Sequence, residues 1–487
     1  MTALVKTHLA WHGRATDSTV QICAMAVDAN GALTAVVNGL TYPLAPAVAP
    51  TLTASTTLGD GNNFGVGSIT VTGLAPNSRT PATVYIGATA IATMSLRTRP
   101  SVGDAFTLVA SGCTDDTHTS PWGDGVLRRF PNACAFFGLG DQIYPDSPEG
   151  GGTVTAQWNE TYQQTSLDVY NATPSGAGTS AAKDTAYVSG ILAHHRVYHR
   201  ALGVTELMHT MEYFELPDDH DQYCGNDRAE GFIGSTGDTG WNYYQDICVD
   251  QDDALHYQGL GDEVRKVVNL QNVPNTDSGA DPAWPSSPHP YWRTTYGDVE
   301  VFCLDLCTYR QSPDLHPAEV ITALGTLQYA WIVEKAHAST ANVLVMMMPK
   351  EFWSEQDGWK WAPEERAAFI LAMSSIQKPI IYLSADTHLG SIHIENDVVC
   401  VTACPAGVGI KNRPNGMENS QEKWRDLGLK TDTTRGRYFY AALERFPGEG
   451  RTRVSLVSHT GEIPWYRDWY DGSRITAYPV ISAQAVA

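Results

Sequence analysis

The feature that most constrains the fold is a short apolar run that ends in a polar cluster, which occurs at least four times between residues 106 and 390. The runs are Phe106–Ala110, Ala133–Leu139, Met211–Leu216 and Ile380–Leu383. Such runs are typical of β-strands buried on both faces. Helix-like segments lie between several strand-like runs, including Pro317–His337 and Ala362–Met373, the latter opened by Pro363 and two glutamates. Alternating strands and helices predict an α/β domain with a largely buried sheet.

Each of the four runs leads into residues that can bind a metal. They are Cys113 after the first run, Asp141 and Tyr144 after the second, Asp218 to Asp221 after the third, and Asp386 and His388 after the fourth. If these strands are parallel neighbours in one sheet, all the clusters lie at one edge and share one pocket. Taken singly, Cys113 fits a small buried hydrophobic residue, and Asp218 with Asp219 fits a turn or a helix start. Their recurrence after successive strands favours a shared site with sulfur, oxygen and nitrogen donors.

The chain divides near residue 100. Residues 1–100 carry short alternating strands separated by Asn-Gly, Asp-Gly and Pro-Asn turn signals, which predict an accessory β-sandwich of fibronectin or immunoglobulin type. Residues 101–487 form the predicted α/β domain with a C-terminal tail. Within it, residues 150–183 and 225–296 lack periodicity and are either insertions that shape a site or surface decoration.

Charge and cysteine content exclude some classes of protein. The formal net charge is −21, which argues against a nucleic-acid-binding or anionic-membrane surface because phosphate backbones are bound through an excess of Lys and Arg. Nine cysteines without a Cys-x-x-Cys pair indicate neither a disulfide framework nor a zinc ribbon. No secretory h-region and no membrane-spanning run is present in the sequence. We therefore expect a cytosolic protein, or a secreted mature form whose leader is absent.

The order of motifs along nearly the whole chain resembles the alkaline phosphatase D (PhoD) family of calcineurin-like metallophosphoesterases. The motifs are Ser-Gly-Cys113, Gly-Asp141-x-x-Tyr144, Asp-Asp219-His220-Asp, Leu304 to Arg310, Leu324-Gly-x-x-Gln328-x-x-Trp331, Asp357-Gly-Trp359 and Ser-Ala-Asp386-Thr-His388. None of them is specific alone, but as an ordered set they are. The resemblance implies a four-layer α/β/β/α sandwich behind the N-terminal β-module.

The resemblance also implies a metal centre and roles for its residues. Fe³⁺ would be bound by Cys113, Asp141, Tyr144 and His388, with Asp141 bridging to Ca²⁺ and Asp219 and Asp386 completing the calcium shell. Mn²⁺ or Zn²⁺ is the alternative at the second position. His220 would meet the transferring phosphoryl group, and Asn226, Asp305 and Arg310 would contact substrate or support the ligands.

The implied function is hydrolysis of a phosphate monoester or diester, with a metal-bound hydroxide as nucleophile. Three departures from the family pattern leave the ligands in place but affect specificity: Ala385 replaces a common glycine, Cys307 a common arginine, and Val343–Met348 lacks a terminal Asn or Gln. Two alternatives remain open. One is hydrolysis of phospholipids, in the manner of a phospholipase D, or of another ester on the same scaffold. The other is a silent binding protein, which competent residues at all six ligand positions disfavour.

Overall fold

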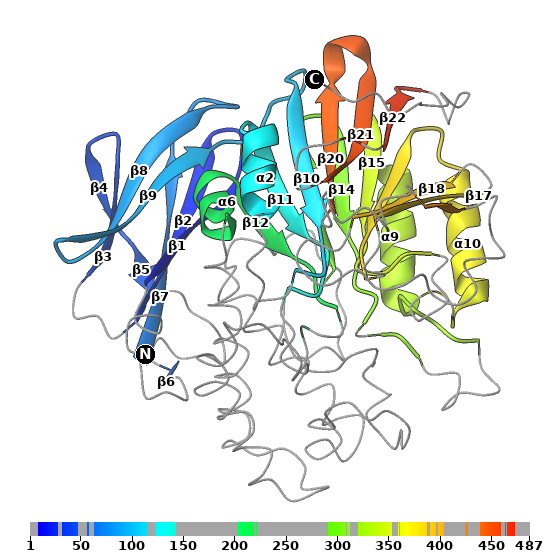
Figure 1. The fold of residues 1–487 in the computed structure, drawn as a ribbon, viewed down its shortest axis with the longest axis horizontal. Helices are drawn as coiled ribbons and strands as arrows, with labels where there is room; N and C mark the ends of the chain where they lie inside the picture. The colour runs from blue at the N-terminus through cyan, green and yellow to red at the C-terminus, as the bar shows by residue number, and fades with distance from the viewer. Residues whose placement is uncertain are drawn as a thin grey trace, which may run out of the picture.

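The structure is a computed structural model in which four β-sheets and their helices are arranged along one axis (Figure 1). Strands β1–β9 lie at one end of the molecule and helices α9 and α10 at the other. The described residues are 8–27, 32–46, 56–57, 63–114, 122–142, 203–218, 221, 291–307, 309–311, 320–352, 359, 361–386, 390–395, 398–403, 424–426, 439–458, 463 and 465–472.

The N-terminal part consists of two antiparallel sheets. The first contains β1 (Leu9–Ala15), β2 (Thr19–Val27), β7 (Asn63–Thr72), β5 (Ala45–Pro46) and β6 (Thr56–Thr57), and the second β4 (Leu40–Pro43), β3 (Leu33–Val37), β8 (Arg79–Ile86) and β9 (Thr89–Arg97). Along β8, buried positions alternate with more exposed ones. This alternation turns one face of the sheet inward, and a single apolar cluster draws side chains such as Val20 and Ile22 from the first sheet and Val84 from the second.

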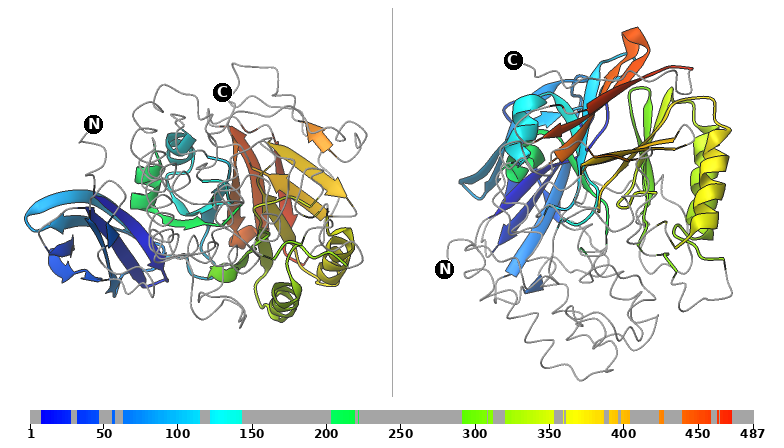
Figure 2. Two further views of the ribbon diagram at one scale, coloured as in Figure 1. Left: turned by 90° about the horizontal axis from the view of Figure 1, so that it is seen from below. Right: turned by 45° about the vertical axis from the view of Figure 1, so that its right-hand side comes forward.

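The rest of the described chain forms two larger sheets (Figure 2). The six-stranded sheet has the order β12 (Glu212–Glu215), β11 (Ala133–Gly138), β10 (Phe106–Ser111), β20 (Phe439–Phe446), β21 (Arg451–Ser458) and β22 (Trp465–Tyr470). Its first three strands are parallel to one another, and β20, β21 and β22 pair antiparallel. The parallel trio therefore ends at one edge, as predicted for the first three apolar runs.

The seven-stranded sheet contains the fourth run. Its order is β13 (Trp292–Tyr296), β14 (Val299–Cys303), β15 (Val343–Met347), β16 (Ile380–Ser384), β18 (Val398–Thr402), β17 (Ser391–Glu395) and β19 (Trp424–Asp426). Strands β14, β15, β16 and β18 are parallel. The expectation that all four site strands are neighbours in one sheet is therefore wrong, because β16 belongs to the second sheet. Mixed sheets with helices between their strands confirm the α/β prediction.

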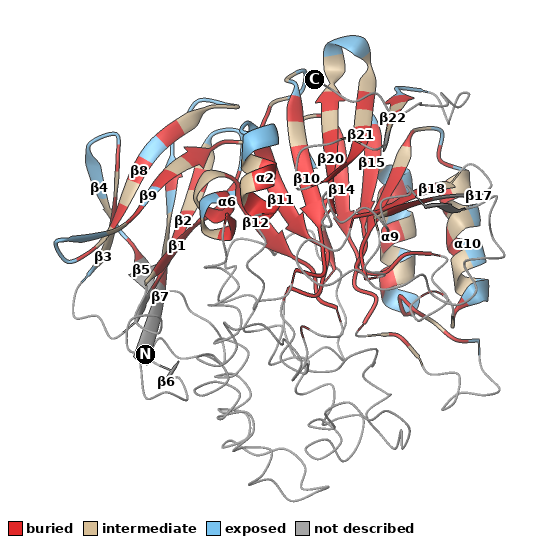
Figure 3. Ribbon diagram, in the orientation of Figure 1, coloured by how far each residue is buried: buried red, intermediate tan, exposed pale blue. Residues whose placement is uncertain are grey.

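The two larger sheets share one core. Strand β15 is apolar throughout because both of its faces pack against other elements. Val343, Val345 and Met347 belong to the cluster that also holds residues of β10 and β11, whereas Leu344 and Met346 belong to a second cluster with residues of α9 and α10. Successive side chains point to opposite faces of a strand, so both faces of β15 are covered. The central strands are accordingly buried along their length (Figure 3).

The helices confirm one sequence boundary and correct another. Helix α10 (Pro363–Ser374) begins at the proline that the sequence placed in a first turn. Helix α9 (Thr326–Ala338) begins nine residues later than the predicted start at Pro317, because Gly325 takes φ +74° and the Glu365 carboxylate accepts the Ala323 and Leu324 N–H groups. The other described helices are α2 (Trp122–Arg129), α6 (Val204–Thr210) and the 3-10 turn η5 (Pro447–Glu449). Within the described chain, no helix has the length and apolarity needed to cross a membrane.

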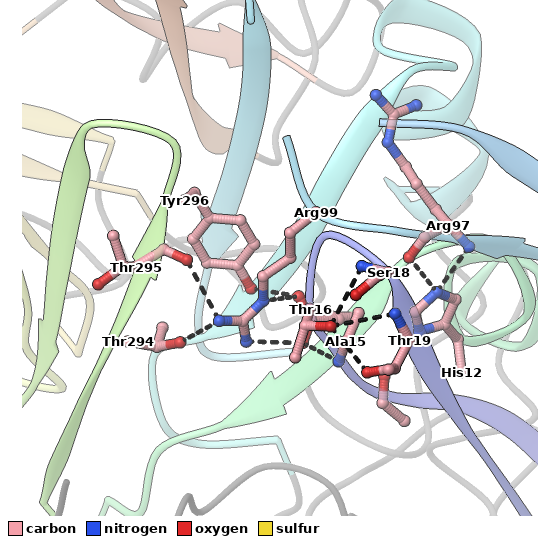
Figure 4. A network of polar contacts seen from close by, with 12 residues as sticks. His12, Ala15, Thr16, Ser18, Thr19, Arg97, Arg99, Thr294, Thr295 and Tyr296 are labelled. Carbon is pink, nitrogen blue, oxygen red and sulfur yellow. Dashed lines mark hydrogen bonds and ion pairs between the residues drawn. The ribbon is translucent and has the colours of Figure 1, made fainter. Parts of the chain in front are cut away.

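A buried ion pair joins the N-terminal part to the two larger sheets. The Arg99 guanidinium donates to both carboxylate oxygens of Glu212 on β12, at 2.8 Å each, and lies 4.5 Å from the ring centroid of Tyr296 on β13. Glu212 also accepts the Ala15 N–H and the Tyr296 hydroxyl, each at 2.7 Å. Figure 4 shows Arg99 pointing toward Tyr296 and Thr294. Elements from three sheets thus converge on one carboxylate, and this fixes β12 in place.

Candidate metal centre

The carboxyl ends of the site strands approach one another closely enough to require glycine at two positions. A Cβ on Gly112, after β10, would lie 2.5 Å from the Cβ of Ala385, which follows β16 in the other sheet. A Cβ on Gly140, after β11, would lie 2.5 Å from the Cβ of Asp218, which follows β12. The loops therefore meet although the strands belong to two sheets, and the predicted common pocket is formed across the sheets.

Three of the predicted ligands share an unusual backbone conformation. Cys113, Asp141 and Asp386 have φ values of 55°, 56° and 72°, and the only other described non-glycine residues with positive φ are Asn38 and Asn77. Asparagine and aspartate tolerate this left-handed region more readily than other non-glycine residues, whereas it is uncommon for Cys. Strained conformations of this kind cluster at functional sites, where the surrounding structure holds them.

Three buried carboxylates converge at this edge. Asp141, Asp218 and Asp386 each offer an oxygen, and these atoms all lie within 4.8 Å of one another. We call these residues the carboxylate group. Like charges this close repel one another strongly in a buried setting, so the arrangement requires cations nearby.

The Asp221 carboxylate holds two of these loops together. Its Oδ2 accepts the N–H groups of Asp141 (2.8 Å) and Asp218 (3.0 Å), and its Oδ1 accepts the N–H of Gln142 (2.8 Å). The Thr114 N–H donates to the Asp141 carbonyl at 2.8 Å, and the Cys113 N–H to the Gly140 carbonyl at 3.0 Å. Backbone bonds to a buried carboxylate are strong and directional, and they explain how Asp141 keeps its left-handed conformation.

Two further side chains contact the carboxylate group. Nζ of Lys350, three residues beyond β15, lies 3.0 Å from Oδ1 of Asp218 and 3.0 Å from Oδ1 of Asp386. The Cys307 thiol, beyond β14, donates to Oδ1 of Asp218 at 3.1 Å. Loops from both sheets therefore contribute to one polar cluster.

The composition of this cluster fits a metal ion. The three carboxylates of the group and the Lys350 ammonium together carry a formal charge of two negative, and the buried Asp221 carboxylate beside them adds a third. Burying uncompensated charge is costly, and a bound cation removes that cost. Carboxylate oxygens are hard donors, which suit Mg²⁺, Ca²⁺, Mn²⁺ and ferric iron better than soft metals.

The predicted site residues divide into two sets. The structure brings Asp141 and Asp386 together and places the Cys113 backbone beside the Asp141 loop. Five predicted residues lie outside the described part of the chain, and their roles stay predictions: Tyr144, Asp219, His220, Asn226 and His388.

Asp305 and Arg310 lie on the loop after β14. Both are buried: Asp305 accepts the Cys307 N–H at 2.9 Å, and its own backbone pairs with the side-chain amide of Gln328 on α9. The Arg310 guanidinium lies 5.2 Å from the ring centroid of Trp361. These contacts describe the shape of the loop, and a role for either residue at substrate stays a prediction.

The sequence placed Asp218 in the predicted shared pocket without a ligand role, and it did not assign Cys307 or Lys350 to the site. Asp218 stands beside the predicted Asp219 in Pro-Asp-Asp-His, so the motif was found and the resemblance selected its second carboxylate. Lys350 directly follows the apolar run Val343–Met348, with only Pro349 between. It therefore had the same signal as the predicted ligands, namely a polar residue just beyond a buried strand.

Comparison with known proteins bears on the fold. No family model matches the sequence, and no curated protein matches it significantly. Among solved structures, a structure of PhoD is 13% identical, with a TM-score of 0.60, over 95% of this chain and 91% of that chain. The chain has the fold of PhoD. This similarity confirms the fold that the motif resemblance implied. At 13% identity, overall sequence similarity would not have indicated that fold.

A second solved structure is similar over the whole length of the chain. A purple acid phosphatase isolated from yellow lupin (Lupinus luteus) seeds is 9% identical, with a TM-score of 0.53, over 98% of this chain and 78% of that chain. The fold is therefore shared with two proteins that differ widely in sequence from this chain. Fold alone does not determine activity, so the function has to be argued from the carboxylate group.

Proposed function

We propose that this protein hydrolyses phosphate esters at a metal centre built on Asp141, Asp218 and Asp386. The observation that carries the proposal is the convergence of three buried carboxylates, two of them in left-handed backbone, at the meeting edge of two sheets. The PhoD fold supports it, because open α/β sheets bind ligands at the carboxyl ends of their strands. A bound metal ion would activate water and neutralise the charge that develops on the phosphoryl group.

Each described residue would have a defined task. The carboxylate group would hold the metal, and Asp221 would keep the Asp141 and Asp218 loops at the correct separation through its three N–H contacts. Hydrogen bonds that fix the backbone beside the ligands orient those ligands for metal binding.

Cys113 and the predicted residues outside the described part complete the proposal. Cys113, Tyr144 and His388 would join Asp141 at Fe³⁺, Asp219 would join the second metal position, and His220 would stabilise or protonate the leaving oxygen. This donor set would suit iron with calcium, since a tyrosine oxygen on iron and carboxylates on calcium match hard donors with hard cations. Elemental analysis of purified protein decides between iron with calcium and the manganese or zinc alternative.

We further propose the finer architecture that the resemblance implies. Residues 1–100 would be an accessory β-sandwich of fibronectin or immunoglobulin type, and residues 101–487 a four-layer α/β/β/α sandwich with a C-terminal tail. Support for the layers comes from opposite ends of the domain. The ring centroids of Trp122 on α2 and Phe136 on β11 lie 5.1 Å apart in a tilted arrangement, and Phe369 of α10 packs with residues of β15.

The test is a substrate panel run on wild-type protein and Asp141→Asn. The panel contains aryl phosphate monoesters, aryl phosphate diesters, phospholipid vesicles and carboxyl esters, and phosphate or alcohol release is measured. We expect turnover of a phosphate ester that Asp141→Asn lowers by at least about 100-fold, together with loss of bound metal, because a ligand to the catalytic ion is removed.

Asp104→Asn is the matched control, because Asp104 lies before β10, at the opposite end of that strand, and accepts the local Ser101 N–H there. It should keep both metal and turnover. Turnover of carboxyl esters alone, or wild-type protein that binds no metal and releases no product, would refute phosphoester hydrolysis. Turnover of phospholipid alone would assign the substrate class to lipid.

A further inference from the structure

The Lys350 ammonium is a positive charge in contact with two residues of the carboxylate group. Its side chain is completely buried, with 0% of its surface exposed, and Nζ lies 3.0 Å from an oxygen of Asp218 and 3.0 Å from an oxygen of Asp386. Lysine is almost never fully buried unless its charge is paired. Here the pairing carboxylates come from two different sheets, since Asp218 follows β12 and Asp386 follows β16.

The lysine is held in position by its neighbours along the chain. Glu351 and Phe352, which follow it, are also fully buried. Pro349, which precedes it, packs so close to Gly140 that a Cβ there would lie 3.2 Å away. The Ala385 N–H donates to the Pro349 carbonyl at 3.2 Å. A lysine on an exposed loop can swing into solvent when a metal ion arrives, but this one is enclosed by the loops that carry the ligands.

We propose that the Lys350 ammonium takes one of the two cation positions expected of a dinuclear centre, so that each chain binds one metal ion at the carboxylate group. The two oxygens in contact with Nζ are then held by the ammonium, and Asp141 with the remaining carboxylate oxygens binds the ion. A second metal ion would share Asp218 and Asp386 with a positive charge that cannot move away, which lowers its affinity. The inference rests on the proposed function in requiring that the group binds metal, and it replaces the second metal position of that proposal with the Lys350 ammonium.

Metal stoichiometry tests the inference without reference to activity. Full-length wild-type protein, Lys350→Met and Lys350→Gln are equilibrated in parallel with Ca²⁺, Mn²⁺ and Zn²⁺, passed through a desalting column, and assayed for metal per chain by elemental analysis. We expect about one ion per chain in the wild type and about two in the variants, because removing the ammonium opens its position to a cation.

A second measurement, the dependence of folding stability on added metal, tests the inference even where a variant is destabilised. Without the ammonium, the buried carboxylates repel one another, so Lys350→Met should be stabilised more steeply by added metal than the wild type, by mass action on the folded state. Lys378→Met is the matched control: Lys378 Nζ donates to the Ser339 and Ala341 carbonyls rather than to a carboxylate. It should keep one ion and the wild-type dependence on metal.

Each outcome decides the inference. Two ions in wild-type protein, or the same count and the same metal dependence in Lys350→Met as in wild type, would overturn it and leave phosphoester hydrolysis standing. One ion in wild type and two in the variants would support it even if the substrate panel finds no phosphate release, in which case the proposed function alone fails. Wild-type protein that binds no ion would overturn both.

Discussion

Gly140→Ala measures how tightly the loops of the candidate centre are packed. Gly140 has φ +100°, and a methyl group there would lie 2.5 Å from the Cβ of Asp218 and 3.2 Å from that of Pro349. Two carbon atoms in contact are normally about 3.5–4.0 Å apart. The Asp218 loop must therefore move by about 1 Å. This moves the Asp218 carboxylate away from those of Asp141 and Asp386.

Two costs add in this variant. A left-handed backbone costs an L-residue about 1–2 kcal/mol. Forcing an extra methyl group into packed surroundings costs a further ~1–3 kcal/mol. The expected loss in free energy of unfolding is thus about 2–5 kcal/mol.

The chain offers a matched control in Gly103→Ala. Gly103 has φ +98°, nearly the value at Gly140, but a Cβ there would meet nothing within 4 Å. This variant should lose only the backbone cost, about 1–2 kcal/mol. The difference between the two variants isolates the collision with Asp218.

Urea unfolding of wild type and both variants, analysed with one common dependence of the unfolding free energy on urea concentration, gives the loss of stability in each variant. Elemental analysis gives the metal content. Gly140→Ala should lose more stability than Gly103→Ala and should also lose metal. Equal losses of stability, or wild-type metal content in Gly140→Ala, would show that the Gly140 loop does not pack against Asp218 as described.

Two further predictions concern the N-terminal part and its junction with the larger sheets. Glu212→Gln should lower the free energy of unfolding in urea by about 3 kcal/mol or more, because it leaves the largely buried Arg99 guanidinium without its carboxylate. Glu334→Gln, in an exposed pair with Lys335, should leave stability unchanged, and equal effects would contradict the role of burial. Burial lowers the pKa of His12 despite the opposing charge of Glu212, and its Nε2 accepts the Arg97 N–H, so the folded protein keeps this ring neutral. The unfolded chain binds that proton below about pH 6.5, so thermal stability should fall as pH falls below 6.5. This slope should be smaller in His12→Gln, and an unchanged slope would refute the assignment.

Much of the fold could be predicted from local pattern. The apolar runs gave β10, β11 and β16 to within a residue, because a strand covered on both faces has no polar position to interrupt it. The start of α10 was predicted from Pro363, whose fixed φ suits a first helical turn. The start of α9 was missed because its boundary depends on Glu365, which lies 39 residues beyond the first helical residue, Thr326.

The sequence by itself determined that metal-binding side chains follow buried strands, since that is a property of residues adjacent in the chain. Asp141 and Asp386 were predicted in this way and do converge. Tertiary structure decided which strands share a sheet and therefore how the loops meet. Asp386 reaches Asp141 from the second sheet, and Lys350 contacts Asp218 across more than a hundred residues of sequence. Contacts of that kind follow from sheet pairing and close packing, which no local pattern encodes.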